Sequence, residues 1–178
     1  GEIRGQLGPV AMVATLEGLH RHSAKLTSAG LHHEQLAGHI EGRDLFVALR
    51  NLVGNARQHP KAGQTQVDVQ IALVKTPGGN MITVADNGAG MAAETAINLL
   101  TGRPMHDGHV VDHRNPQEFH GFGWLRIREA CAKLGIVPEI HSEPGQGTTV
   151  TLHLPRGLLQ SDTPRTAAED TALLHQFL

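Results

Sequence analysis

Apolar side chains recur along this chain with two different periods. Apolar positions spaced about 3.6 residues apart, as in amphipathic helices, predict helices at 10–26, 44–59, 92–100 and 123–134. Alternation of apolar and polar residues and the turn signals around it predict strands at 67–73, 81–85, 137–141 and 148–154, with a shorter extended stretch at 31–40. Helices interleaved with hairpins predict an α/β fold, a two-layer α/β sandwich in which helices cover one face of a mixed sheet.

Gly, Pro and polar residues divide this pattern into segments. Residues 1–9 are predicted to be a flexible tail, and residues 10–155 a single domain that Pro155 closes. Within it, Asp44 is predicted to cap a helix that Pro60 ends. The polar stretch from 101 to 120 has little apolar periodicity and is predicted to be a mobile loop. Residues 156–178 are predicted to be a linker and a short terminal helix.

Composition and charge narrow the class of protein. The chain has 178 residues, 39% of them apolar, and a net charge of -2 without a long basic run, which argues against a dedicated nucleic-acid binder. Cys131 is the only cysteine and cannot form an internal disulfide, which predicts a reducing, cytoplasmic setting.

No apolar run reaches the roughly 18 residues of a membrane-spanning helix. Because the chain begins with Gly, we expect a piece of a longer protein, with any membrane anchor outside it. The 13 histidines are scattered and lack the spacing of a structural zinc site.

The first segment with candidate chemistry is the helix end from Asn51 to His59. Asn51 and Asn55 lie four residues apart and therefore share a helix face. An Asn carbonyl is a hard oxygen ligand that suits a Mg²⁺ ion bridging phosphates. On its own, the pattern is more simply explained as an ordinary polar helix face.

Three further segments contain closely spaced glycines. Asp86 follows an apolar strand, where its carboxylate can accept a hydrogen bond from an exocyclic amine, and Gly88 and Gly90 permit the backbone to approach a flat ring. An Asn-Gly turn is the simpler alternative, and a calcium loop is excluded because its downstream acidic ligands are missing. Residues 119–124 lead from a loop into a helix, whose free N–H groups can bind phosphate. Residues 145–155 are most simply a hairpin turn and its second strand.

In this order the four segments resemble the N, G1, G2 and G3 boxes of the GHKL superfamily, most closely the histidine-kinase catalytic domain, over residues 30–155. The resemblance implies that Mg²⁺ and ATP bind, with Asn55 on the metal and Asp86 on the adenine amino group. It implies the nucleotide-binding residues Asn55, Asp86, Gly88, Gly90, Met91, Gly121, Phe122, Gly123, Trp124 and Thr148. It places Asn51 near the phosphates and His59 beside the nucleotide, and these two are candidate catalytic residues together with Arg103 and Arg114 of residues 101–120. Residues 101–120 would be the ATP lid.

The sequence departs from this family pattern in three places. Gln58 stands where many histidine kinases have a Lys or Arg that meets a phosphate, and Arg57 points about 100° away on a helix. Arg103 and Arg114 are the candidate replacements. Residues 99–102 replace the usual Phe-rich box, and Phe119 replaces the first glycine of the G2 box. These changes bear on turnover and lid closure more than on nucleotide binding.

The residue at position 51 separates the subclasses of the superfamily. ATPases and anti-sigma serine kinases usually carry Glu there as a general base, whereas Asn51 cannot take a proton at neutral pH. An imidazole acceptor needs little help from a base. The resemblance therefore implies transfer of the γ-phosphoryl group to a histidine on a dimerisation domain outside this chain, in a homodimeric full-length protein that signals to a response regulator. The alternatives are a GHKL ATPase or serine kinase, and a non-catalytic nucleotide-binding module.

Overall fold

The computed structural model of the chain describes residues 9–20, 24–30, 35–36, 39–102, 122–160 and 175. The elements in chain order are α1 (Pro9–His20), β1 (Ala24–Ala29), β2 (Gln35–Leu36), α2 (His39–Gln58), β3 (Val67–Thr76), β4 (Gly79–Asp86), α3 (Ala93–Thr101), α4 (Phe122–Leu134), β5 (Val137–Glu143), β6 (Gly147–Leu154) and β7 (Leu159–Gln160). No helix of this described part is long and apolar enough to cross a bilayer.

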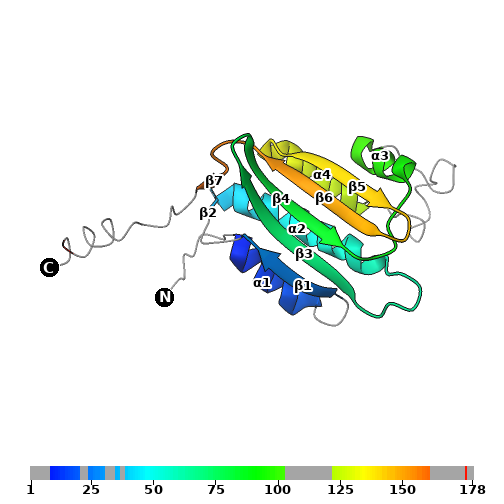
Figure 1. The fold of residues 1–178 in the computed structure, drawn as a ribbon. Coiled ribbons are helices and arrows are strands. Elements are labelled where there is room, and N and C mark those ends of the chain that lie inside the picture. Colours follow the sequence, from blue (N-terminus) through cyan, green and yellow to red (C-terminus); the bar gives the residue numbers. More distant parts are fainter. Residues whose placement is uncertain are drawn as a thin grey trace.

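Five of these strands form one mixed sheet in the order β1-β3-β4-β6-β5. β3, β4, β6 and β5 pair with their neighbours antiparallel, whereas β1 runs parallel to β3. Parallel neighbours need a crossover connection, and α2 provides it between β1 and β3. Figure 1 shows α2 and α4 side by side across one face of the sheet, with α1 beside β1. The predicted two-layer α/β sandwich with a mixed sheet is confirmed.

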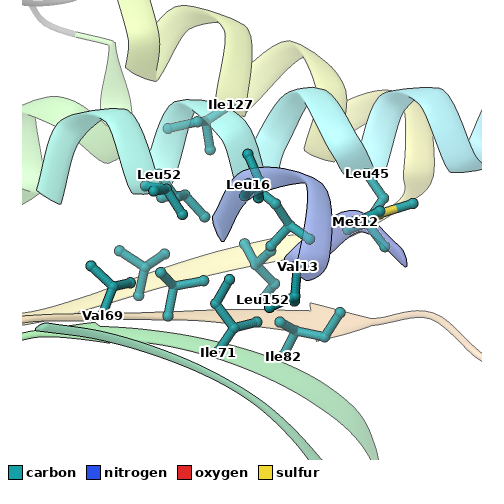
Figure 2. Packing of buried hydrophobic residues seen from close by; sticks show 14 of the residues in the cluster. Met12, Val13, Leu16, Leu45, Leu52, Val69, Ile71, Ile82, Ile127 and Leu152 are labelled. Atoms are coloured by element: carbon teal, nitrogen blue, oxygen red, sulfur yellow. The ribbon is translucent and has the colours of Figure 1, made fainter. Parts of the chain in front are cut away.

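The hydrophobic core lies between this helical layer and the sheet. In β3, Val67, Val69, Ile71 and Leu73 are buried while Asp68 and Gln70 are exposed, as their alternation predicted. In Figure 2, Leu45 and Leu52 of α2 point towards Ile71, Ile82 and Leu152 of the sheet, and α1 adds Met12, Val13 and Leu16. On α4, within the predicted helix 123–134, the apolar residues Trp124, Ile127, Cys131 and Leu134 are buried. The pairing of α2 with the sheet fixes where the Asn-bearing end of that helix lies.

Two sequence predictions about the first part of the chain are wrong. The first helix ends at His20, and Leu26 lies in β1, where it is buried with Ala24 by strand alternation rather than on a helix face. The apolar spacing continued across the break because both elements face the same core. Asp44 does not cap α2, because the helix begins at His39 and Asp44 falls inside it.

The packed unit extends past Pro155. Leu158 is buried in the core, and Leu159 and Gln160 pair antiparallel with Leu36 and Gln35 to form a separate two-stranded sheet. The tail before Pro9, most of the stretch 101–120 and, apart from His175, the terminal helix from 167 lie outside the described residues.

Candidate functional site

The last turns of α2 bring Asn51 and Asn55 against the first turn of α4. The Asn51 amide donates to the carbonyl of Val47 at 2.7 Å, which fixes its side chain on the helix. A Cβ on Gly123 would lie 3.0 Å from Asn55 Oδ1 and 3.7 Å from Asn51 Oδ1, so a side chain here would crowd the Asn55 amide. Both Asn oxygens therefore face the start of a helix, where backbone N–H groups favour anions.

Asn55 has an incomplete hydrogen-bond set. Within the described residues its amide nitrogen is buried and has no hydrogen-bond partner. Buried donors in proteins are almost always paired, so this nitrogen is expected to meet an acceptor such as a bound ligand or an ordered water. A phosphate oxygen is such an acceptor, and the Asn55 carbonyl oxygen beside it is suited to Mg²⁺.

Asp86 ends β4 and is held by two backbone N–H groups. The N–H of Gly88 donates to Asp86 Oδ1 at 2.9 Å, and the N–H of Thr148, its cross-strand neighbour, also bonds to the carboxylate. Burial raises the pKa of Asp86, while these two hydrogen bonds and the nearby His59 oppose that rise. A carboxylate offers about four lone-pair sites, so acceptor capacity remains for an amine of a ligand.

The glycines around Asp86 make room for protein backbone rather than for a ligand ring. A Cβ on Gly88 would lie 2.5 Å from the carbonyl oxygen of His59, and Gly90, with φ 67°, lies against the carbonyl of Glu143. Gly147, with φ 91°, lies against the carbonyl of Asp86. The expectation that Gly88 and Gly90 leave space for a flat ring is therefore replaced by a different reason for glycine: the loop after β4 packs tightly between α2 and the β5–β6 turn.

Ser142 joins the two sides of this loop. Its hydroxyl oxygen accepts from the N–H of Met91 at 2.8 Å, donates to the carbonyl of Gly147 at 3.0 Å and lies 2.8 Å from Thr148 Oγ1. Through Ser142 the segments of Met91 and Thr148 are tied to each other. Sequence reasoning missed this residue, because a serine just past the end of the predicted strand 137–141 has no local signature.

His59 connects the two ends of the site. Its carbonyl accepts from the N–H of Ala89 at 2.8 Å, which joins the residue after α2 to the loop after β4. The Asn pair lies on one side of this link and Asp86 with Thr148 on the other. The arrangement suits an elongated ligand with an amine at one end and metal-bound phosphates at the other.

A family model described as "Histidine kinase-, DNA gyrase B-, and HSP90-like ATPase" matches residues 40–158, which is more than half of the chain. The chain belongs to this ATPase family. The matched span contains the whole described site and ends at the buried Leu158.

Solved structures with the same fold include several domains of histidine kinases. The histidine kinase domain of the blue-light activated kinase of Erythrobacter litoralis EL346 matches with a TM-score of 0.55 and 16% identity, over 80% of this chain and 60% of that one. Full-length ShkA in complex with AMPPNP matches with a TM-score of 0.62 and 16% identity, over 85% of this chain and 30% of that one. The catalytic domain of ThkA matches with a TM-score of 0.61 and 11% identity, over 84% of this chain and 93% of that one. The chain thus spans a part of the first two proteins and nearly all of the third.

Not every residue expected to bind nucleotide in this ATPase-family domain lies at the site. Trp124 is 4% exposed and belongs to the core cluster, so its side chain packs between the layers instead of facing a ligand. Arg103, Arg114 and Gly121 lie outside the described residues, and Phe122 is described only as the first residue of α4. Arg57 and Gln58 are both exposed. In the described part of the chain, no group of three or more His, Cys, Asp or Glu could hold a metal.

Proposed function

We propose that this chain is the ATP-binding catalytic domain of a histidine kinase, which binds Mg²⁺-ATP and directs its γ-phosphoryl group to a histidine on a dimerisation domain outside this chain. The observation that carries the proposal is the buried, unpartnered amide nitrogen of Asn55 beside the start of α4. It is a donor without an acceptor, in a family of ATPases, at the place where phosphates would lie.

The residues divide the nucleotide between them. Asp86 would accept a hydrogen bond from the adenine amine, with Thr148 beside it. Asn55 would donate to a phosphate oxygen and hold Mg²⁺ through its carbonyl oxygen. The first turn of α4 at Gly123 would offer backbone N–H groups to the phosphates. Phosphoryl transfer depends mainly on such positioning and on neutralised charge, and Mg²⁺ supplies that neutralisation when bound.

Asn51 supports transfer rather than hydrolysis. Its amide is fixed by the hydrogen bond to Val47, and an amide cannot accept a proton from water at neutral pH. A histidine acceptor is nucleophilic in its neutral form and does not need that base. In this proposal the full-length protein is a cytoplasmic or membrane-anchored homodimer that passes the phosphoryl group to a response regulator.

Titration with a fluorescent ATP analogue and Mg²⁺ tests the nucleotide site. We expect magnesium-dependent binding that Asn55→Ala and Asp86→Ala each weaken about tenfold or more, as for loss of a charge-assisted hydrogen bond or a metal ligand. Asn80→Ala at the opposite end of β4 and Asp44→Ala inside α2 are matched controls, because neither residue lies at the site. Binding that is independent of magnesium, or an equal affinity for the analogue in the Asn55→Ala and Asn80→Ala variants, would contradict the proposal.

The transfer step has its own test. The chain is mixed with a separate dimerisation domain and γ-labelled ATP, and label is expected on the acceptor histidine, with little steady-state release of phosphate. Rapid release without an acceptor would favour a GHKL-type hydrolase or serine kinase instead. Nucleotide binding with neither transfer nor release would identify a non-catalytic module.

A further inference from the structure

A hydrogen-bond network outside the proposed nucleotide contacts joins the connection between α2 and β3 to Asn87, the residue after Asp86. Asn87 Oδ1 accepts from the side chain of Gln64 and from the N–H of Asp68, both at 2.8 Å. The Asn87 amide donates to the Asp68 carboxylate at 3.1 Å, and the Asn87 N–H donates to the Asp68 carbonyl at 3.2 Å. We call these residues the Gln64–Asn87–Asp68 network.

Gln64 fixes its own loop as well. Its side-chain oxygen accepts from the N–H of Lys61 at 2.9 Å, and its N–H donates to the Lys61 carbonyl at 3.0 Å. The same side chain thus holds the turn after Pro60 closed and reaches Asn87. The connection from α2 to β3 is therefore attached to the loop after β4 at two places, through Gln64 and through the carbonyl of His59.

Both attachments bear on the direction of the Asp86 carboxylate. Its Oδ1 is held by the N–H of Gly88, so the carboxylate turns with the peptide units on either side of Asn87. Asn87 is hydrogen-bonded to Asp68 near the start of β3, and Gly88 is buried against His59. A change at Gln64 would release one of the groups that set this peptide geometry without touching the carboxylate or a ligand.

We propose that Gln64 and Asn87 are positioning residues that set the base selectivity of the nucleotide site by orienting Asp86. The inference rests on the proposed ATP binding and goes beyond it, since neither residue contacts the nucleotide in that proposal. The Gln64 amide is a neutral hydrogen-bonding group at the surface, and its net contribution to stability is correspondingly modest. Its consequence lies in geometry: a displaced carboxylate meets the adenine amine less well but loses nothing with a base that lacks this amine.

ATP and inosine triphosphate, compared as Mg²⁺ complexes by calorimetric titration, separate positioning from general stability. Inosine triphosphate carries a carbonyl oxygen in place of the adenine amine, so the wild-type chain is expected to prefer ATP. Gln64→Glu keeps the acceptor for Lys61 but removes the donor to Asn87. We expect it to weaken ATP binding about two- to tenfold, the range for one neutral hydrogen bond, and to leave inosine triphosphate binding unchanged. Gln70→Glu, on the exposed face of β3, is the matched control for the added charge.

Three outcomes decide the inference. Equal weakening of both nucleotides by Gln64→Glu, or no change in either, would overturn it. The inference would be supported if Gln64→Glu lowers the preference for ATP in the wild-type chain but has no effect on it in an Asp86→Ala background. Gln64 would then act through Asp86. Asn87→Ala should lower the preference further, and if that variant does not fold, the surface variant Gln64→Glu still tests the inference by itself. If Asp86→Ala alone leaves the preference for ATP intact, the proposed base recognition fails, which is a separate result.

Discussion

Gly147 lies so close to the main-chain carbonyl of Asp86 that no Cβ fits between them. The two residues belong to neighbouring strands, where Asp86 pairs with Thr148, and their contact brings the β5–β6 turn onto the end of β4. Because Gly147 has no side chain, the end of β4 can lie against it, and this contact helps to set the position of the Asp86 carboxylate.

Gly147→Ala is expected to destabilise the domain strongly. Gly145 in the same turn also has a positive φ, 79° against 91°, but nothing lies within 4 Å of its Cβ position. Gly145→Ala therefore reports the backbone strain alone, about 1 kcal/mol, and Gly147→Ala is expected to cost roughly twice that or more because a carbonyl must also move. Urea unfolding of both variants measures the difference. Equal losses would contradict the close contact.

Asp86→Asn is expected to separate stability from binding. Burial raises the pKa of Asp86 above its value in the unfolded chain, so the ionised carboxylate disfavours the folded state. Relative to the Asn variant, the wild-type domain should lose stability as the pH rises through the interval between the ordinary and the raised pKa, and then level off. At neutral pH we expect Asp86→Asn to unfold at an equal or higher urea concentration while ATP affinity falls about tenfold or more. A variant that is clearly less stable at neutral pH but not at acid pH would contradict the sign.

Arg128→Ala is expected to loosen the end of α3. The guanidinium of Arg128 on α4 donates to the carbonyl of Leu99 at 2.6 Å and lies against Gly102, the left-handed residue that caps α3. Loss of this charge-assisted hydrogen bond should speed amide exchange in α3 by about tenfold. Arg126→Ala, an exposed change on the same helix, is the control and should leave exchange in α3 unaltered. Equal effects of the two variants would argue against a specific role for Arg128.

Glu139 on β5 is expected to titrate below its usual range. Its two oxygens contact His141 at 2.7 Å and His153 at 2.8 Å, and these hydrogen bonds, that of His153 first, lower the pKa of Glu139. Any stabilisation from this group is present above its ordinary pKa and is lost as the pH falls through the lowered one. Titration of the Glu139 side-chain carbon by NMR should show the midpoint rise in His153→Ala and rise further in His141→Ala combined with His153→Ala. An unchanged midpoint in the double variant would contradict the contacts.

The sequence predicted elements well wherever one period lay inside one element. β3 and β4 flank a Pro-Gly turn and α4 has a continuous apolar stripe, so the fold class and most boundaries followed. The first helix was extended to Leu26 because α1 and β1 bury their apolar residues in the same core. Periodicity records which residues are buried and not where the backbone changes direction. Trp124 lies on the apolar stripe of α4 and is buried in the core, whereas the family resemblance placed it at the nucleotide.

The candidate site was predictable only for residues that lie in ordered motifs. Asn55 and Asp86 stand in such motifs. Gln64 and Ser142 do not, because each acts through hydrogen bonds to a segment far away in sequence, and a glutamine in a loop or a serine in a strand carries no local mark. The glycines were placed in the right loops for a different physical reason, since the space they leave is occupied by carbonyl groups of His59 and Glu143.

The small β2–β7 sheet gives the domain a mechanical connection between two distant stretches of chain. Leu159 and Gln160 are hydrogen-bonded to Leu36 and Gln35, which lie just before the start of α2 at His39. A pull or twist applied at Gln160 therefore acts first on the entry to the helix whose other end carries Asn51 and Asn55. The C-terminal flank of the domain and the proposed phosphate end of the site are thus connected through one helix, α2.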